Sequence, residues 1–389
     1  MTPEARVAAA IDILDDILDG APAEKALTTW ARQHRFAGSG DRAAIRDHVF
    51  DALRQRRSFG WLGGGETGRA LMIGMLKIAG QDLDTFFNGK GYGPPPLTEA
   101  ERSSGQPLSA APASVQLDTP DWLFPHLETS LGDTMGPVME ALKSRAPVFL
   151  RVNQSKGTVE QAVDLLAADE IGAEPHPLSP TALNVTRNPR RVQNAQAYLT
   201  GLVELQDVAS QAVVDRLLPR VAGKSVLDYC AGGGGKSLAL AAGGAGRVTA
   251  HDADPRRMAD LPKRALRAGA DIGVASKVSG VFDMVFCDAP CSGSGAWRRQ
   301  PDAKWRLTQE RLDELCRTQA AILDQALNHV SEGGYLAYAT CSMLACENQD
   351  QVTAFLSRHA DWMCDEQCQF SPVDGGDGFF LSVFRLKTN

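Results

Sequence analysis

Two short cysteine segments point to covalent chemistry. They are Asp288–Gly293, which reads DAPCSG, and Thr340–Ser342, which reads TCS. A thiolate that adds to an electron-poor carbon can turn a weak nucleophile, such as C5 of a pyrimidine, into a reactive one. Completing that reaction also requires a second acid or base, which helps to remove a proton and to expel the thiolate. Two cysteines in one pocket would meet these needs.

A glycine loop follows a predicted strand at 225–228. Gly232 to Gly235 permit a tight turn from strand to helix and a close approach of the backbone to a ligand. The Walker A phosphate loop is excluded, because it requires glycine where this chain has Cys230. A dinucleotide fingerprint stays possible but does not explain the cysteine segments. Asp252 ends the next predicted strand, where a carboxylate can accept hydrogen bonds from ribose hydroxyls.

These residues require a common scaffold. From about residue 201 predicted strands and helices alternate, which indicates a parallel sheet with helices on both faces. Ligands of such sheets bind at the carboxyl ends of the strands, and the glycine loop, Asp252, Asp288 and Cys341 all lie at predicted strand ends. The predicted strands are 225–228, 247–252, 284–288 and 335–340; the predicted helices start at 236 and cover 255–268 and 308–330.

The preceding part of the chain divides into three predicted regions. Residues 1–90 are predicted to be all helical, because apolar side chains recur at three- and four-residue steps. Prolines and small residues mark 91–119 as a linker, since proline removes backbone donors and disfavours helix just before it. Residues 120–200 are predicted to form a small α/β subdomain, with helices at 122–143 and 158–168 and strands near 149–152 and 182–185. Residues 201–389 form the last domain.

Composition limits the possible classes of protein. The chain has 389 residues, 43% of them hydrophobic and 22% charged, which is typical of globular proteins. No apolar run reaches the length of about 18 residues that a spanning helix requires, and the N-terminal region lacks a signal-peptide pattern. The eight cysteines show no zinc-ligand spacing. We therefore expect a cytoplasmic protein with free thiols, without a membrane segment or a metal.

Charge patterning bears on nucleic acid binding. A net charge of −7 argues against binding by bulk electrostatics, because neutralising phosphates depends on Lys and Arg. Two local groups of basic residues could act instead, although either could also be a solvated face or part of a core. The first comprises Arg32, Arg35, Arg42, Arg46, Arg54, Arg56 and Arg57, and the second comprises Arg298, Arg299, Lys304 and Arg306 around Trp297 and Trp305.

At its motifs the chain resembles the Sun family of RNA 5-methylcytosine methyltransferases, and within it the RsmB-type enzymes of small-subunit rRNA. The resemblance is carried by residues 228–237, 251–254, 288–293, 298–305, 338–342 with 347–348, and 376–380. It implies a Rossmann-like class I methyltransferase domain with a doubly wound sheet, preceded by a small α/β subdomain and a NusB-like helical domain. It also implies a monomer that uses S-adenosylmethionine (SAM) to methylate a cytosine of 16S rRNA.

The resemblance also implies roles for particular residues. It makes Cys341 the nucleophile, Cys291 the group that assists product release, and Asp288 a contact at the junction of cofactor and target base. The residues that it implies for SAM are Cys230, Ala231, Gly232, Gly233, Gly234, Gly235, Lys236, Asp252 and Asp288. The family usually has proline in place of Gly233, and its acidic residue after the third strand has no match in 277–281.

Several alternatives stay open at this point. Pro290–Cys291 imitates the motif of DNA cytosine methyltransferases, which would reverse the two cysteine roles. A tRNA could replace rRNA as the substrate. Two other classes are a non-catalytic RNA-binding assembly factor, which would have no chemical need for either cysteine, and a nicotinamide oxidoreductase, which cofactor binding would reveal.

Overall fold

The computed structural model describes residues 1–387. Within it the chain forms two compact units, which we call the helical unit and the sheet unit. The helical unit comprises 1–128, 132–145 and 297–307, and the sheet unit comprises 129–131, 146–296 and the residues from 308 onward. The chain therefore leaves the sheet unit just after the first cysteine segment and returns to it one short helix later.

The N-terminal part of the helical unit is all helical, as predicted. Its helices are α1 (Pro3–Leu18), α2 (Ala23–Gln33), α3 (Ser39–Arg54), α4 (Arg56–Gly63), α5 (Gly68–Ile78) and α6 (Leu83–Phe86). Their apolar faces form one core, in which Val7, Leu14, Val49 and Leu71 are completely buried. The three- and four-residue spacing of these side chains places them on the inner faces of the helices.

The proline-rich segment after α6 contacts these helices. It contains α7 (Glu99–Ser103), the 3-10 turn η1 (Leu108–Ala110) and α8 (Ala113–Gln116). Arg69 on α5 forms an ion pair with Glu101 at 2.5 Å. Lys77 donates hydrogen bonds to the carbonyl oxygens of Leu62 and Ser104. The segment predicted as a linker is thus fixed along the unit by specific polar contacts.

The basic segment after the first cysteine motif is also part of the helical unit. It forms α16 (Pro301–Arg306), and the side chains of Trp297, Arg298 and Lys304 are each no more than 3% exposed. The Trp305 indole donates to the carbonyl oxygen of Leu53 at 2.6 Å. Burial lowers the pKa of Lys304 to about 8, against the opposing attraction of Asp118. The interpretation as an RNA-binding surface is therefore wrong for the three buried side chains, which pack inside the unit.

The remaining helices of this region differ from the prediction. The single helix expected over 122–143 is interrupted, giving α9 (Phe124–Leu131), the 3-10 turn η2 (Gly132–Thr134) and α10 (Met135–Lys143). Gly132 has a φ of +50°, a conformation that favours glycine and ends an α-helix. Helical periodicity continues across this break, which explains why the sequence pattern did not reveal it.

A small antiparallel sheet forms the first part of the sheet unit. Its strands are β1 (Val148–Val152), β2 (Gly172–Pro175), β3 (Ala182–Arg187) and β4 (Val203–Leu205), in the order β2-β3-β1-β4. With it lie α11 (Val159–Ala168), the 3-10 turn η3 (Pro189–Asn194) and α12 (Gln196–Leu199). The expected strands near 149–152 and 182–185 and the expected helix at 158–168 are present. The short strands β2 and β4 were not predicted.

A seven-stranded sheet forms the rest of this unit. Its order is β10-β11-β9-β8-β5-β6-β7. The strands are β5 (Ser225–Asp228), β6 (Arg247–His251), β7 (Ile272–Ala275), β8 (Phe282–Asp288), β9 (Val330–Thr340), β10 (Trp362–Phe370) and β11 (Phe379–Leu386). The first five are parallel to one another, while β11 runs antiparallel to β9 and to β10. This topology confirms the predicted doubly wound α/β class.

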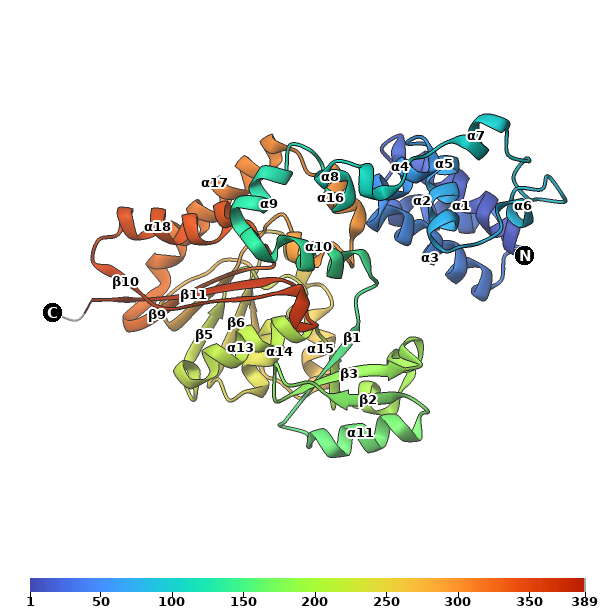
Figure 1. Cartoon of the computed structure of the whole chain (residues 1–389). Helices are drawn as coiled ribbons and strands as arrows, with labels where there is room; N and C mark the ends of the chain where they lie inside the picture. The colour runs from blue at the N-terminus through green and yellow to red at the C-terminus, as the bar shows by residue number, and fades with distance from the viewer. Residues whose placement is uncertain (388–389) are drawn as a thin grey trace. The chain divides into compact units, whose positions relative to one another are not determined.

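Helices cover both faces of the large sheet (Figure 1). On one face α13 (Val208–Val221) and α14 (Gly235–Ala242) pack against alternate side chains such as Val226 and Phe286. On the other face α17 (Gln309–Ala326) and α18 (Gln349–Arg358) pack against Leu227 and Tyr338. Consecutive strand residues thus point to opposite cores, as the period of two requires.

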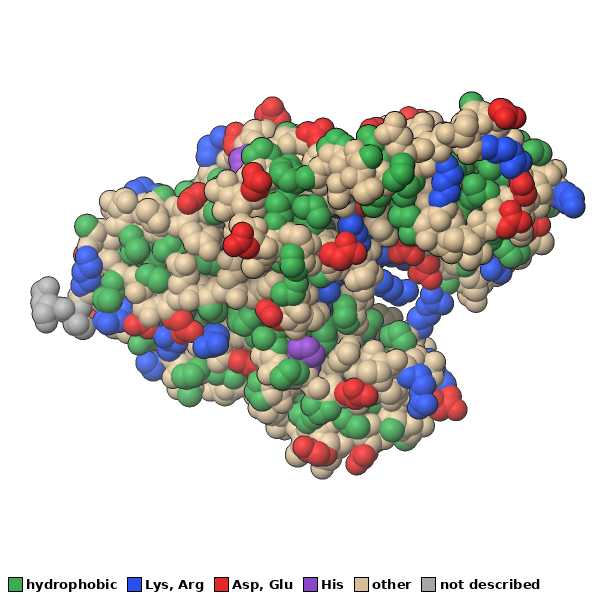
Figure 2. All heavy atoms as spheres, in the orientation of Figure 1, with side chains coloured by type: hydrophobic (Ala, Val, Ile, Leu, Met, Phe, Trp, Pro, Cys, Tyr) green, Lys and Arg blue, Asp and Glu red, His purple; other side chains and the backbone are tan. Residues whose placement is uncertain are grey.

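The edges of this domain complete the element order. The helix predicted over 255–268 is a 3-10 turn, η4 (Pro255–Met258), followed by α15 (Leu261–Ala268). The short turns η5 (Ser294–Ala296), η6 (Leu327–His329), η7 (Ala345–Glu347) and η8 (Pro372–Asp374) connect the later elements. Within the described residues, no helix is long and apolar enough to cross a membrane. On the face that Figure 2 shows, basic and acidic side chains are interspersed.

Candidate active site

Four strands bring the predicted site residues to one edge of the large sheet. Strands β5, β6, β8 and β9 are parallel and adjacent, and they end at Asp228, His251, Asp288 and Thr340. Because parallel strands place their carboxyl ends at the same edge, the loops that follow them meet there. The glycine loop, Asp252, Asp288 and both cysteine segments are parts of these strand ends and loops.

The glycine loop between β5 and α14 is held by its backbone geometry. Gly232 and Gly234 have φ values of +51° and +76°, which L side chains rarely adopt. A Cβ atom on Gly234 would lie 2.2 Å from Leu261 Cδ1, and one on Gly232 would lie 3.1 Å from an Arg257 nitrogen. The Ala231 amide donates to the carbonyl oxygen of His251 at 2.8 Å. The loop is therefore narrow and fixed to the end of β6.

Asp252 closes this loop from the β6 side. Its side chain is only 3% exposed, and its Oδ2 accepts hydrogen bonds from the Gly232 amide at 2.9 Å and from Arg257 at 3.0 Å. Its Oδ1 accepts from the Asp254 amide at 2.9 Å. A carboxylate has about four acceptor positions, so one further donor, such as a ribose hydroxyl, can be accommodated.

Asp228, at the end of β5, is a site residue that the sequence interpretation missed. Its side chain is completely buried, its Oδ2 accepts from the Ser237 hydroxyl at 2.6 Å, and its Oδ1 has no hydrogen-bond partner among the described residues. Burial raises the pKa of Asp228 to about 7. A signal was available, because Asp228 ends a predicted strand in the same way as Asp252 and Asp288 do.

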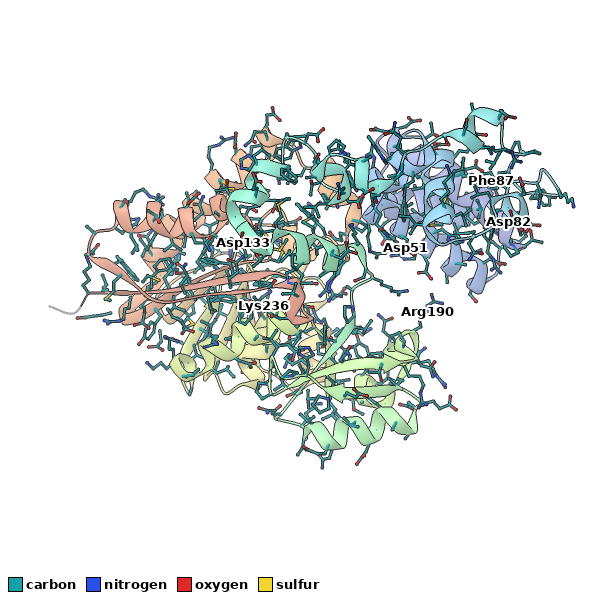
Figure 3. All side chains as sticks on the ribbon, viewed as in Figure 1. Asp51, Asp82, Phe87, Asp133, Arg190 and Lys236 are labelled. Carbon is teal, nitrogen blue, oxygen red and sulfur yellow. The ribbon has the colours of Figure 1, made fainter. Side chains whose placement is uncertain are left out.

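Lys236 and Asp288 join the glycine loop to the first cysteine segment. Lys236, labelled in Figure 3, lies in the first turn of α14, and its ammonium is 2.7 Å from Asp288 Oδ2 and 4.7 Å from the centre of the Phe379 ring. Burial opposes the charged form, but attraction by Asp288, and further by Cys341, outweighs it and raises the pKa of Lys236. Lys236 therefore keeps a positive charge within reach of the second cysteine segment.

The two cysteines predicted to carry the chemistry are in contact. The Sγ atoms of Cys291 and Cys341 are 3.4 Å apart, and both side chains are partly exposed. The hydrogen bond with Cys341 and burial raise the pKa of Cys291 well above its usual value. A thiol with a raised pKa stays protonated, so Cys291 can donate a hydrogen bond to the neighbouring sulfur.

Other cysteines near the site are poorly placed for nucleophilic work. Burial raises the pKa of Cys230, in the glycine loop, and of Cys287, inside β8, far above the ordinary range. Cys287 also belongs to the core between β8 and α17. These thiols remain protonated at neutral pH, so the site contains only one reactive pair.

A second residue that the sequence interpretation left without a role is Glu347. Its carboxylate is completely buried and binds both cysteine segments. Oε2 accepts from the hydroxyls of Ser292 and Ser342, each at 2.5 Å. Oε1 accepts from the Ser292 amide at 2.8 Å and from Gln319 Nε2 at 3.0 Å. Because Ser292 follows Cys291 and Ser342 follows Cys341, one carboxylate fixes the spacing of the two thiols.

The residues at this edge fit SAM. The narrow glycine loop lets a ligand approach the backbone closely, and the unpartnered Asp228 oxygen lies beside it. Asp252 keeps acceptor capacity for a ribose hydroxyl, and carboxylates suit a cationic sulfonium ligand. Within the described residues no group of three or more His, Cys, Asp or Glu side chains is arranged to hold a metal ion. The site thus offers cofactor contacts on one side and a thiol pair on the other.

The fold and site define the class of protein. Five parallel strands continued by an antiparallel pair, with a glycine loop after the first strand, form a Rossmann-like class I methyltransferase domain. Two solved structures share the fold: PH0851 (TM-score 0.75, 21% identity, 99% of each chain) and a methyltransferase homolog protein from Pyrococcus horikoshii (TM-score 0.61, 22% identity, 70% of this chain and 97% of that chain).

Sequence comparison gives the family. Residues 214–384 match the model for 16S rRNA methyltransferase RsmB/F, and residues 119–193 match the model for the RsmF/B-like ferredoxin-like domain. The chain is 36% identical over 281 residues to ribosomal RNA small subunit methyltransferase B of Pectobacterium carotovorum subsp. carotovorum (strain PC1), covering 68% of this chain and 65% of that protein. The counterpart from Yersinia pestis bv. Antiqua (strain Angola) is 33% identical over 286 residues, covering 69% and 66%.

The chain therefore belongs to the RsmB/F methyltransferase family, which confirms the resemblance to Sun-family enzymes. The matched region spans about two thirds of the length of these curated relatives.

Proposed function

We propose that this protein uses SAM to methylate C5 of a cytosine in 16S rRNA through a covalent bond between Cys341 and C6. The observation that carries the proposal is the contact between the Cys291 and Cys341 sulfurs at 3.4 Å. The pair stands at the sheet edge that also carries the glycine loop, Asp252 and Asp288. A scaffold protein or a nicotinamide oxidoreductase would have no use for such a pair.

In the proposed reaction the target cytosine is flipped out of its strand into the site. The Cys341 thiolate adds to C6, and the electron pair displaced from the double bond makes C5 nucleophilic. The glycine loop, Lys236, Asp252 and Asp288 would hold SAM, which would supply the methyl group that bonds to C5; its S–CH3 bond would break and leave the neutral thioether. A base then removes the C5 proton, the double bond re-forms, and the C6–S bond breaks with Cys291 assisting release of the thiolate.

The arrangement of charges supports this division of roles. In this proposal Asp288 hydrogen-bonds the cytosine ring, and the positive charge of its partner Lys236 favours the thiolate form of Cys341 during the reaction. Cys291 is protonated and hydrogen-bonds to Cys341. Cys230, Ala231, Gly233 and Gly235 complete the loop proposed for SAM.

The substrate class is inferred from the relatives, whose names specify small-subunit ribosomal RNA. We propose that the protein acts in the cytoplasm as a monomer. We also propose four functional regions: a NusB-like domain at 1–90, a connecting segment at 91–119, a subdomain at 120–200 and the catalytic domain at 201–389.

One experiment tests chemistry, substrate and roles together. The wild type, Cys341→Ala and Cys291→Ala are incubated with SAM labelled on its methyl group and with unmodified total RNA, and the products are resolved on a denaturing gel. We expect label in 16S rRNA with the wild type, none with Cys341→Ala, and a protein–RNA adduct with Cys291→Ala. Cys368→Ala, a thiol in β10 outside the site, serves as the control.

The other outcomes are equally informative. Label in tRNA would replace the proposed substrate. Normal product release by Cys291→Ala would contradict its proposed role, and an adduct that persists in Cys341→Ala would reverse the two assignments. No label in any RNA would favour a non-catalytic RNA-binding protein.

A further inference from the structure

The structure separates the seven arginines between residues 32 and 57 into two groups. Four of them are bound within the helical unit: Arg46 pairs with Glu24, Arg54 with Asp51, Arg56 with Glu66 and Arg57 with Asp121. The other three, Arg32, Arg35 and Arg42, are exposed, and within residues 1–387 their guanidinium groups have no hydrogen bond or ion pair. In a chain of net charge −7, such unpaired positive charge requires an explanation.

The three unpaired arginines share one hollow. It has a volume of about 690 Å³ and lies between α2 and α3, with Leu27, Trp30 and Ile45 among its apolar lining residues. The paired Arg46 also lines it, and no carboxylate is among its lining residues. A concave surface with three uncompensated guanidinium groups is complementary to a chain of phosphates, which arginine binds with up to two hydrogen bonds each.

An aromatic row leads out of this hollow. Trp30 stacks on His34 with ring centres 4.4 Å apart, and His34 meets the edge of Phe36 at 5.8 Å. Trp30, His34 and Phe36 also line a second hollow of about 480 Å³, together with Tyr92. Phe36 and Tyr92 are 71% and 86% exposed, and exposed rings of this kind are platforms on which unpaired bases stack.

The second hollow has a different charge from the first. Glu4 and Asp12 line it together with Lys90 and Met1, so its charge is mixed, and the two carboxylates offer acceptors for the amino groups of bases. The two hollows share Trp30. A strand whose phosphates lie on the arginines would therefore have its bases directed to the aromatic side, which is the arrangement that a single strand allows and a duplex does not.

We propose that Arg32, Arg35 and Arg42, together with the Trp30–His34–Phe36 row, bind an unpaired strand of the RNA substrate. The phosphates lie on the arginines and the bases on the aromatic rings. This inference rests on the proposed function only where it identifies the bound strand as part of the RNA that is methylated. Binding itself does not depend on methyl transfer and can be tested separately.

The test measures binding of a fluorescent poly-uridine RNA of about 12 nucleotides to the full chain by anisotropy over a range of salt concentrations. The triple variant Arg32→Gln, Arg35→Gln, Arg42→Gln is compared with Lys25→Gln, Arg102→Gln, Arg145→Gln. The control removes the same charge from exposed positions of the same unit that do not line either hollow. Circular dichroism confirms that both variants are folded.

We expect three lost phosphate contacts to reduce the slope of log K against log salt by about 2, since each contact with a single strand contributes about 0.7. The ratio of the wild-type binding constant to that of the triple variant would then fall about 20-fold between about 50 and 200 mM salt. The control variant should keep the wild-type slope. Equal slopes for all three proteins would overturn the inference.

The aromatic part is tested with Phe36→Ala. We expect weaker binding of the single strand by about five-fold or more with an unchanged salt slope, because stacking carries no net charge. Ile78→Ala, which truncates another exposed apolar side chain of the unit, should bind normally. If Phe36→Ala lost the same affinity for an RNA duplex, stacking on unpaired bases would be contradicted. If poly-glutamate at equal charge displaced the RNA fully, the site would instead bind an acidic protein partner.

SAM is absent from these measurements. Failure of methyl transfer would therefore overturn the proposed function without changing the binding result. Normal methylation with unaltered RNA binding by the triple variant would overturn only the present inference.

Discussion

Replacing Glu347 should slow methyl transfer while leaving cofactor binding intact. The carboxylate accepts four hydrogen bonds that tie together the residues following Cys291 and Cys341. In Glu347→Ala the serine hydroxyls can pair with each other, since the Oγ atoms of Ser292 and Ser342 are already 3.3 Å apart. The buried Ser292 amide has no comparable substitute, and leaving such a donor without an acceptor costs about 1 to 3 kcal/mol.

The catalytic effect follows from the spacing of the thiols. Once Glu347 is gone, the backbone after Cys291 is no longer held to the backbone after Cys341. A displacement of a reacting group by about 1 Å costs on the order of 100-fold in rate. We therefore expect Glu347→Ala to reduce the methylation rate by about 10- to 100-fold. Glu347→Gln keeps one acceptor oxygen for the Ser292 amide, so its loss should be below about 10-fold.

The assay is single-turnover methylation of RNA at saturating SAM, combined with calorimetric titration of SAM and with urea unfolding. Glu332→Ala is the control, since this substitution removes the same kind of side chain from β9, where it is exposed. SAM affinity should stay at the wild-type value because Glu347 makes no contact with the glycine loop in the hydrogen bonds described above. If Glu347→Ala is less stable yet methylates at the wild-type rate, the carboxylate is only structural and the reasoning is refuted.

Two further predictions concern the cofactor side. Gly234→Ala should weaken SAM binding at least ten-fold in calorimetry, because the φ of Gly234 is +76° and the new Cβ would lie 2.2 Å from Leu261. Gly233→Ala is the control and should bind SAM nearly normally, because its Cβ would meet only an Arg264 nitrogen at 3.3 Å. Equal losses of affinity in the two variants would contradict the loop geometry. Burial raises the pKa of Asp228 from 3.8 to about 7. Between these two pH values the folded state binds more protons than the unfolded state. The free energy of unfolding therefore falls as pH rises toward about 7, and the loss is complete above it. Urea unfolding from pH 5 to 8 should show the wild type losing on the order of 3 kcal/mol relative to Asp228→Asn, and parallel profiles would contradict this linkage.

The sheet edge that carries the candidate site was predictable because parallel strands impose it. Asp252, Asp288 and Cys341 follow strands that alternate with helices, and this alternation alone brings their loops together. Glu347 was not predictable in the same way. Its four donors come from three segments, and neither periodicity nor spacing along the sequence indicates that they surround one carboxylate.

In the helical unit, too, the sequence pattern did not reveal which side chains are held by tertiary contacts. Seven arginines close together in sequence look alike, but Glu24, Glu66 and Asp121 neutralise three of them from other elements. The segment after the first cysteine motif has the composition of an RNA-binding loop, yet Trp305 bonds to Leu53 and Lys304 is buried. Burial and ion pairing depend on tertiary contacts, so composition could not distinguish bound from available charge.

The buried network also bears on the choice between the two cysteines. The hydrogen bond to Cys341 is the largest cause that raises the pKa of Cys291, followed by burial and the charges of Cys341 and Glu347. A thiol under these influences is a proton donor, whereas the reverse assignment would require it to be the attacking thiolate. Lys236, in contrast, is coupled to Cys341. In the proposed reaction the positive charge of Lys236 thus favours attack by Cys341, while the raised pKa keeps Cys291 protonated.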